Sequence, residues 1–431
     1  MLNITLVFYN LFLFLYRTGV LLISPWNTKA KLWTQGRKNI LETIRAAVGD
    51  DLSSDYIWMH CASLGEFEQG RPVLEHIKAI NSKARIVLTF FSASGYEVRK
   101  NYEGADHIFY LPVDSYSNAA KFIEIIKPKL VLWVKYEYWY FYLTQLKRHN
   151  IPVLLISGIF RKNQVFFKWY GGWYRKMLLC FSHIFVQNSA SKKLLDSINL
   201  SANVTVSGDT RFDRVIEIAE QATPIPVIAS FCGDHQVIVA GSTWKEDEEE
   251  LDHFANTHPE IKFIIAPHEI EPQHLLEVKK LFYNSILFTE WEDQFKKGTS
   301  FNSLSSANVL IIDNIGMLSR LYRYATVTYV GGGFGNDGVH NVLEAAVYGK
   351  PVVFGPVYDK FVEAEELLDC GGAFSIDNAL DLEKVFQVLL RSNHECSRAG
   401  ESAKSYVYLK RGAKEKIVSY MEEKRLGLFH A

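Results

Sequence analysis

Residues 329–356, YVGGGFGNDGVHNVLEAAVYGKPVVFGP, decide the fold, because they read as a strand, a glycine loop, a helix and a second strand. The β-branched and aromatic run Thr326–Val330 predicts a buried strand, and Pro351–Phe354 predicts the next one. The glycines between them allow positive φ and a close approach of the backbone to a ligand. Asn341 is expected to cap a short helix over Asn341–Tyr348.

The glycine loop includes Gly332 and Gly333 and precedes the start of a helix. Such a helix terminus gathers unpaired N–H groups and a partial positive charge, so it suits a phosphate group. Glu344 lies one turn into the helix, where its carboxylate could accept hydrogen bonds from ribose hydroxyls. The alternative is a tight βα turn that needs glycines for packing alone, since glycine loops recur in many α/β folds.

The chain has 431 residues, of which 48% are hydrophobic and 22% charged, which is ordinary for two or three globular domains. The net charge of −1 gives no sign of a nucleic-acid partner. The five cysteines form no CxxC pair and no metal-ligand spacing is present, so we expect a reducing compartment and no metal site. The acidic run Glu246–Glu250 is expected to be a solvated first helical turn.

Residues 1–23 are almost entirely apolar, and a bilayer-crossing helix needs roughly 20 residues. Arg17 weakens that interpretation, because a cation inside a bilayer is costly or must reach the interface. The cations expected to stay in the cytoplasm and meet anionic headgroups are Lys29, Lys31, Arg37, Lys38 and Arg45. We predict a membrane anchor over residues 1–45 that spans the bilayer or lies in its interface. A hydrophobic helix buried on the domain is the alternative.

From Asp55 onward, short apolar strands alternate with helical patterns, which predicts parallel sheets covered on both faces. The pattern restarts after a linker-like segment, QATPIP. We therefore predict an α/β fold with two Rossmann-like, doubly wound domains, residues 46–220 and 221–405, facing across a cleft. Ligands of such sheets bind at the carboxyl ends of the strands. Residues 406–431 read as a helix that packs back on the first domain.

Three strand ends carry polar side chains. Glu66 follows the first strand in HCASLGE (60–66), where a carboxylate is well placed as a general base or as a complement to the helix N-terminus. Ser242 and Thr243 offer N–H and hydroxyl donors to a phosphate, or cap the next helix. His268 follows Pro267 at the end of a strand, where its ring could contact a base or a phosphate or be structural.

Two further segments could bind ligands. Ile315, Gly316 and Met317 occupy a βα turn whose backbone could contact a nucleobase, although an ordinary loop is the default interpretation. Aromatic and basic residues alternate in RKNQVFFKWYGGWYRK (161–176), which could meet a lipid acceptor and its phosphates or form an ordinary surface helix.

These motifs, in this order, resemble the Kdo (3-deoxy-D-manno-octulosonic acid) transferases of lipopolysaccharide synthesis. The segments that carry the resemblance are HCASLGE (60–66), TFFSASGYE (89–97), LPVD (111–114), KPKLVLWVKYEYW (127–139), VTVSGDTRFD (204–213), GSTWKEDEE (241–249) and VGGGFGNDGVHNVLEAAVYGKPVVFGP (330–356). The resemblance implies a GT-B fold, a CMP-Kdo donor, a lipid A precursor (lipid IVA) as acceptor and inversion at the anomeric carbon. It also implies a location on the cytoplasmic face of the cell inner membrane, and neither a metal nor another cofactor.

The resemblance implies roles for individual residues. Glu66 stands where the family keeps its catalytic base, and Arg211 stands where it usually has a lysine thought to stabilise the transition state. Glu137 is the remaining acid of a segment in which the family has two, since Lys135 replaces the first. The contacts with CMP carry over to Pro267, Ile315, Gly316, Met317, Asn341, Val342, Leu343 and Glu344. His268 and Met317 stand where many relatives have arginine and glutamate.

Three other functions are compatible with parts of the sequence. One is another GT-B glycosyltransferase that uses a UDP-sugar on a lipid-linked acceptor. Another is a membrane-tethered protein that binds a nucleotide sugar without turnover. An NAD-dependent oxidoreductase is disfavoured, because the first strand is followed by HCASLGE and not by a GxGxxG loop.

Overall fold

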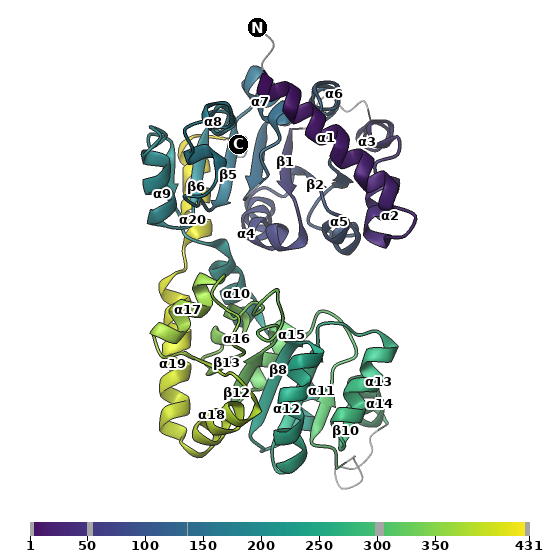
Figure 1. Ribbon diagram of the computed structural model, residues 1–431, viewed down its shortest axis with the longest axis vertical. Coiled ribbons are helices and arrows are strands. Elements are labelled where there is room, and N and C mark those ends of the chain that lie inside the picture. The colour runs from purple at the N-terminus through teal and green to yellow at the C-terminus, as the bar shows by residue number, and fades with distance from the viewer. Residues whose placement is uncertain (1–3, 50–54, 136, 298–305, 427–431) are drawn as a thin grey trace. The chain divides into compact units, whose positions relative to one another are not determined.

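The computed structural model describes residues 4–49, 55–135, 137–297 and 306–426. The chain divides into two compact units, and unit 1 comprises residues 1–214 and 411–431, while unit 2 comprises residues 215–410 (Figure 1). The division falls inside helix α10 (Thr210–Gln221) and not in the proline-containing linker that follows it. The predicted boundary at residue 220 was therefore six residues late, because a continuous helix leaves one unit and enters the other.

Unit 1 is built on a parallel sheet whose strands run in the order β3-β2-β1-β4-β5-β6-β7. The strands are β1 (Tyr56–Cys61), β2 (Arg85–Phe90), β3 (His107–Tyr110), β4 (Leu130–Val134), β5 (Val153–Gly158), β6 (His183–Val186) and β7 (Val204–Val206). The chain winds outward from β1 in one direction and then from β4 in the other. This order is that of a doubly wound sheet, as the alternating pattern predicted.

Both faces of this sheet are buried, which explains why its strands are apolar without alternation. Trp58 and Trp133 point to one face, where they pack with Phe122 and Tyr142. Met59 belongs to the cluster on the opposite face, with residues of α4. The helices of unit 1 are α1 (Ile4–Ile23), α2 (Thr28–Gln35), α3 (Ile40–Val48), α4 (Leu64–Ile80), α5 (Ala93–Arg99), α6 (Tyr116–Ile126), α7 (Tyr140–Arg148), η1 (Val165–Phe167), α8 (Gly172–Leu178), α9 (Ser189–Asp196) and α20 (Ala413–Glu423).

Helix α20 returns from unit 2 to unit 1 and lies against α4 (Figure 1). Ile417 and Met421 enter the cluster on the α4 face of the sheet, and the ring of Tyr420 lies 4.1 Å from that of His183. Asp213 accepts hydrogen bonds from the N–H groups of Gly412 (2.6 Å) and Lys414 (2.9 Å). The last acid of GDTRFD therefore fixes the start of the returning helix.

Unit 2 repeats the architecture with the order β10-β11-β9-β8-β12-β13-β14. Its strands are β8 (Val237–Thr243), β9 (Lys262–Pro267), β10 (Ser285–Leu287), β11 (Val309–Ile311), β12 (Val327–Val330), β13 (Val352–Phe354) and β14 (Ala373–Ser375). Its helices are α11 (Pro226–Cys232), α12 (Lys245–Thr257), α13 (Pro272–Leu281), α14 (Phe288–Lys296), α15 (Leu318–Leu321), η3 (Tyr322–Tyr324), α16 (Leu343–Ala346), α17 (Val362–Asp369), α18 (Ala379–Arg391) and α19 (Asn393–Leu409). The prediction of two Rossmann-like domains of the GT-B type is confirmed.

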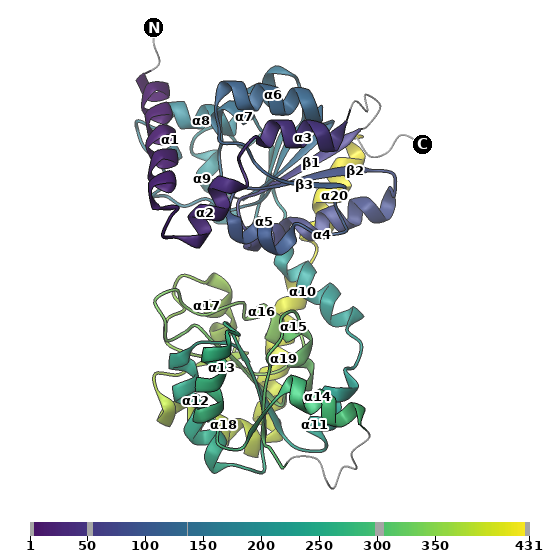
Figure 2. The same cartoon turned by 90° about the vertical axis from the view of Figure 1, so that its right-hand side faces the viewer.

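The apolar N-terminal segment forms helix α1, which lies alongside unit 1 in both views (Figures 1 and 2). In the described part of the chain it is the one unbroken helix that is long and apolar enough to cross a membrane. Only 6% of its apolar window is buried inside the protein. The alternative of a hydrophobic helix buried on the domain is therefore wrong.

Candidate functional site

The residues that we assigned to a site lie at the carboxyl edges of the two sheets. Each sheet reverses its winding at one pair of neighbouring strands, β1 and β4 in unit 1 and β8 and β12 in unit 2. At such a point the loops leave toward opposite faces, so a crevice opens between them. Glu66 and Glu137 follow β1 and β4, Ser242 is the second-last residue of β8, and Gly332 follows β12.

Glu66 lies in the first turn of α4 and is 7% exposed. Ser63 caps this helix by accepting from the N–H of Glu66 at 3.5 Å, and the Glu66 carboxylate accepts from the N–H of Ala62 at 2.5 Å. The interpretation that Glu66 complements the helix N-terminus therefore holds. A role for Glu66 as base stays a prediction, which the bond to Ala62 does not test.

The carboxylate of Glu137 contacts two aromatic side chains, an imidazole and an indole. Its Oε2 lies 3.2 Å from Nε2 of the fully buried His60 and accepts from Nε1 of Trp139 at 2.9 Å. Nδ1 of His60 lies 2.9 Å from Oγ1 of Thr89 on β2. Because β2, β1 and β4 are adjacent strands, the sheet itself sets the position of this carboxylate.

Arg211 is the second residue of helix α10 and pairs with Asp209, which we had not assigned to the site. Its Nε donates to Oδ2 of Asp209 at 2.9 Å. The neighbouring Thr210 donates to the carbonyl of Gln69, one turn after Glu66 on α4. Unit 1 thus brings Arg211 and Glu66 to the same end of α4, with Asp209 offsetting part of the guanidinium charge.

Arg37 does not serve as a surface cation, contrary to our expectation that it meets lipid headgroups. It donates to the carbonyls of Phe91 (2.7 Å) and Leu111 (2.9 Å), and its guanidinium lies 4.1 Å from the ring centre of Trp33. Burial lowers the pKa of Arg37 to about 10. The residue instead ties the segment between α2 and α3 to the ends of β2 and β3.

The glycine loop of unit 2 packs backbone against backbone. A Cβ on Gly331 would lie 2.4 Å from the carbonyl oxygen of Ser242, and one on Gly333 would lie 2.6 Å from the nitrogen of Gly355. Gly332 adopts a positive φ of 91°, and its N–H donates to Oδ2 of Asp247 at 2.8 Å. The tight-packing alternative therefore accounts for these glycines, and the Gly332 amide is already used within the protein.

Two residues of the acidic run are buried, so the expectation of a solvated helical turn is wrong for them. Asp247 accepts from the hydroxyl of Tyr329 as well as from Gly332, and burial raises its pKa. Glu248 accepts from the hydroxyl of Thr243 at 2.9 Å and lies 3.2 Å from Nε2 of His274. Thr243, which we predicted to donate a hydrogen bond to a phosphate, is fully buried, and its hydroxyl donates to Glu248 instead. Composition could not reveal this, because charge runs usually face solvent.

Three rings are stacked at the ends of β8 and β9. The ring of His268 lies 4.5 Å from that of Trp244 and 4.6 Å from that of His340. Nε1 of Trp244 donates to Nε2 of His340 at 2.9 Å, which requires a neutral imidazole acceptor. Burial, with a further contribution from His268, lowers the pKa of His340 to about 4. Ser242 adjoins this stack along the chain and adopts the left-handed conformation, with φ 55°.

The other residues that we predicted to contact CMP differ in exposure and in local structure. The helix expected over Asn341–Tyr348 is only the four-residue α16. The side chain of Asn341 accepts from the N–H of Leu343 at 3.3 Å, at the start of this helix, and donates to Glu344 at 2.9 Å. The side chains of Val342 and Leu343 are fully buried, so only their backbone could reach a ligand. The turn at 315–317 is open, with Ile315 86% exposed and Gly316 at φ 95°. Pro267 ends β9 and is buried.

Comparison with known proteins finds a similarity to one family. Residues 32–214 match the family described as 3-deoxy-D-manno-octulosonic-acid transferase (kdotransferase). A 3-deoxy-D-manno-octulosonic acid transferase of Aquifex aeolicus is 27% identical over 346 residues, which cover 79% of this chain and 87% of the relative. The chain thus resembles Kdo transferases over most of its length, and its residues 32–214 match the model of that family.

Two further comparisons bear on the extent of this likeness. A bifunctional glycosyltransferase/methyltransferase of Fusobacterium nucleatum is 26% identical over 384 residues, and the match spans 86% of this chain but only 56% of that relative. The solved UDP-GlcNAc 2-epimerase of Neisseria meningitidis, bound to UDP-GlcNAc, superposes with a TM-score of 0.60 at 18% identity. That match covers 85% of this chain and 100% of the epimerase. The epimerase shows the shared fold alone.

The match to the Kdo transferase family spans residues 32–214 and ends where the first segment of unit 1 ends, so Glu66, Glu137 and Arg211 all lie within it. His60 and Asp209 lie in the same motifs, and sequence reasoning had given them no role. His60 offered a signal, because it is the polar residue in an otherwise apolar strand, YIWMHC. Asp247 and Glu248 gave none that separates them from their exposed neighbours.

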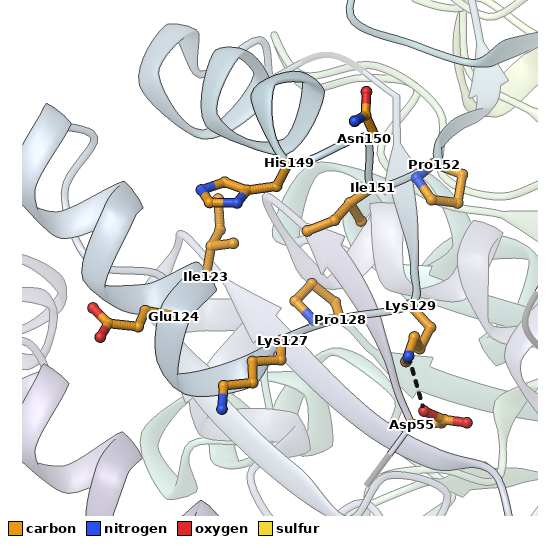
Figure 3. A pocket seen from close by; sticks show the side chains of 10 residues that line it. All are labelled: Asp55, Ile123, Glu124, Lys127, Pro128, Lys129, His149, Asn150, Ile151 and Pro152. Carbon is orange, nitrogen blue, oxygen red and sulfur yellow. Dashed lines mark ion pairs between the residues drawn. The ribbon is translucent and has the colours of Figure 1, made fainter. Parts of the chain in front are cut away.

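A cavity of about 580 Å³ lies at the opposite edge of the unit 1 sheet, where β4 and β5 begin (Figure 3). Lys127, Lys129 and His149 line it, and Lys129 pairs with Asp55 at 3.5 Å. The cavity lies at the amino ends of the strands, so it is separate from the candidate site. Among the described residues, no group of three or more His, Cys, Asp or Glu side chains could hold a metal ion.

Proposed function

We propose that this protein transfers Kdo from CMP-Kdo to a lipid A precursor, lipid IVA, with inversion at the anomeric carbon. The observation that carries the proposal is the placement of Glu66 and Glu137 at the carboxyl ends of β1 and β4, within the segment that matches the Kdo transferase family. The reaction would take place on the cytoplasmic face of the inner membrane, where α1 would hold the protein.

Inversion needs a single displacement. An acceptor hydroxyl gives its proton to Glu66, and the oxygen attacks the anomeric carbon of Kdo from the side opposite CMP. The new carbon–oxygen bond forms as the bond to the phosphate oxygen breaks, and CMP leaves with the electron pair. One base is sufficient, since no covalent intermediate forms.

Two groups of unit 1 would support this step. Arg211 places a cation at the end of α4 that carries Glu66, where it would stabilise the negative charge that develops on the departing CMP. Glu137, fixed by His60 and Trp139, would orient the sugar or the acceptor through its carboxylate. We expect no metal ion, because amides and cations can stabilise a single phosphate.

Unit 2 would bind the CMP portion of the donor. The Gly332 amide and the Thr243 hydroxyl are engaged within the protein. We therefore assign phosphate recognition to Ser242 and to the exposed edge of His268, and base recognition to the open turn at 315–317. Glu344, which accepts from Asn341, would meet the ribose.

The direct test supplies the purified full-length protein with CMP-Kdo and lipid IVA and measures CMP release and the mass of the lipid product. A product heavier by one or more Kdo units supports the proposal and also counts the sugars transferred. The proposal would be refuted if no preparation of the protein releases CMP under conditions in which another Kdo transferase does. CMP binding without release would indicate the non-enzymatic alternative.

The nucleotide preference separates the proposal from a UDP-sugar transferase. We expect CMP to raise the melting temperature more than UMP or UDP does. A larger shift with the uridine nucleotides would favour the alternative.

A further inference from the structure

Helix α1 is attached to unit 1 along one of its sides. Near its start, the hydroxyl of Tyr9 donates to Oδ2 of Asp114 at 2.6 Å and accepts from the N–H of Tyr140 at 3.3 Å. The ring of Tyr9 lies 5.5 Å from that of Trp173 on α8. Asp114 is 2% exposed and also accepts from the N–H groups that begin α7, so this attachment point is part of the folded core.

The same side of α1 remains in contact with unit 1 toward its end. Leu13 is 5% exposed, and the ring of Tyr16 lies 5.9 Å from that of Trp33 and 6.1 Å from that of Phe91. Val20 and Ile23 line a cavity of about 270 Å³ together with the loop that follows β2. At a rise of 1.5 Å per residue, the contacts from Tyr9 to Ile23 extend over about 21 Å of helix.

The opposite side of α1 is apolar and exposed. Its largest exposed side chains include Ile4 (70%), Phe8 (63%), Phe12 (58%), Phe14 (65%), Leu15 (58%) and Leu22 (66%). An apolar surface of this kind on a soluble protein normally marks a contact with a membrane or another protein.

We propose that α1 does not cross the membrane but lies along it, with one side fixed to unit 1 and the other inserted into one leaflet. A crossing helix would place residues 9 to 23 through most of the roughly 30 Å hydrocarbon layer. The parts of unit 1 that touch those residues would then enter the layer as well, including the buried Asp114 and the irregular backbone at Ser92. Irregular backbone exposed to lipid is not tolerated there.

The surroundings of α1 favour an anionic leaflet as the occupant. Trp26, directly after α1, is 87% exposed, and Trp169, in the loop before α8, is 93% exposed; tryptophan is enriched where membrane meets water. Residues 158–178, which include α8, contain no acid and five cations: Arg161, Lys162, Lys168, Arg175 and Lys176. Lys29 and Lys31 on α2 are exposed near the other end of α1. Such cations are attracted to anionic headgroups.

This placement of α1 extends the proposed function. It rests on that function only for the identity of the lipid acceptor. The ring of Phe91, which α1 contacts through Tyr16, lies 4.7 Å from that of Trp139, and Trp139 donates to Glu137. The rings of Tyr16, Phe91 and Trp139 thus connect α1 to a carboxylate of the candidate site. The hydroxyl of a lipid acceptor would therefore reach the candidate site while the lipid stays close to the membrane surface.

The first experiment determines the side on which each terminus lies. Full-length protein with different epitope tags at its two ends is prepared in sealed membrane vesicles, and protease is added outside, with a lumenal protein as the control for sealing. We expect both tags to have the same accessibility before detergent is added. A crossing α1 would place the tags on opposite sides, so that one is protected until detergent opens the vesicles, and that result would overturn the proposal.

The second experiment tests the inserted face with vesicles of phosphatidylethanolamine and phosphatidylglycerol. The triple variant Phe8→Ser, Phe12→Ser, Leu15→Ser should bind these vesicles at least about 100-fold more weakly, because three apolar side chains no longer enter the leaflet. The matched control replaces three exposed apolar residues of unit 2, Leu276→Ser, Leu380→Ser and Leu409→Ser, and should bind as the unchanged protein does. Melting temperatures report whether either variant is unfolded.

Two outcomes would overturn the leaflet as the occupant. Unchanged vesicle binding of a folded α1 variant would show that this face does not enter the membrane. A stable dimer of the unchanged protein that the α1 variant abolishes, with no vesicle binding by either, would assign the face to a second copy of the chain. Neither measurement uses CMP-Kdo, so failure of the proposed transfer reaction would leave this result intact.

Discussion

The two units are both doubly wound parallel sheets, but they differ in what stands at the carboxyl edge of the sheet. In unit 1 the edge carries charged side chains fixed by other side chains, as in Glu137 with His60 and Trp139. In unit 2 the edge consists of loops whose backbones touch, as in Gly331 with Ser242 and Gly333 with Gly355. The buried acid Asp247 serves there to hold a loop and not to face a ligand.

This difference indicates a division of labour between two copies of one architecture. A positioned carboxylate can move a proton, so unit 1 is equipped for chemistry. Closely packed loops and stacked rings form a rigid surface of fixed shape, so unit 2 is equipped to recognise a ligand. If this is correct, changes at the unit 1 edge should alter turnover, and changes at the unit 2 edge should alter stability and donor affinity.

The largest effect is expected for Glu66. Glu66→Gln keeps an oxygen that can accept from the N–H of Ala62 but removes the base, so turnover should fall by about 10²–10⁴-fold with an unchanged melting temperature. Glu66→Ala should lose the same turnover and in addition about 1 kcal/mol of stability, because the helix terminus loses its acceptor. Single-turnover rates and thermal melts measure the two effects. A Glu66→Gln variant that keeps its turnover would reduce Glu66 to a helix cap.

A stability effect in unit 1 should appear with pH at Asp114. Burial raises the pKa of this carboxyl to about 6, from a reference value of 3.8. The folded state therefore binds the proton more tightly, so this stabilisation is complete below about pH 4 and is lost as the pH rises through about 6. The loss amounts to about 3 kcal/mol.

The variant Asp114→Asn isolates this contribution, since the other titrating groups stay the same. The free energy of unfolding of the unchanged protein, relative to the variant, should fall between pH 4 and pH 7. Denaturant titrations at each pH measure it. A constant difference over that range would show that Asp114 titrates as an ordinary exposed carboxyl.

In unit 2, Gly333→Ala should destabilise the fold by about 1–3 kcal/mol, because the new Cβ would lie 2.6 Å from a backbone atom of Gly355. The matched control is Gly335→Ala, whose Cβ would lie 3.5 Å from the carbonyl oxygen of Gly332, an ordinary contact. Thermal unfolding of the two variants compares them directly. Equal stability would mean that the loop relaxes and that its close packing is not required.

The smallest effects are expected from removing one indole N–H in each unit. Trp139→Phe deletes a hydrogen bond to Glu137, and we expect turnover to fall by about tenfold, the value of one bond to a charged group. Trp244→Phe deletes the bond to His340 and should raise the KM for CMP-Kdo a few-fold with little change in kcat. The reverse pattern, with kcat sensitive in unit 2 and KM in unit 1, would contradict the proposed division of labour.

The sequence by itself determined the elements and their order. Runs of β-branched and aromatic residues separated by helical periods predicted every strand of both sheets, because parallel strands buried on both faces must be apolar throughout. The strand ends in turn identified Glu66, Ser242 and His268 as edge residues, since the carboxyl ends of parallel strands meet on one side of a sheet, whereas Glu137 came from the family resemblance. The apolar N-terminal helix could be read from composition alone.

Only the tertiary structure decided which polar groups are already partnered. Arg37, Thr243 and Asp247 read as a surface cation, a phosphate donor and a solvated acid, yet each is bonded to a segment distant in the chain or to a neighbouring helix. The same holds for α1, whose attachment depends on Asp114, 105 residues from Tyr9. Periodicity records which side of an element is apolar, whereas a hydrogen bond between distant segments exists only after the chain has folded and brought both atoms together.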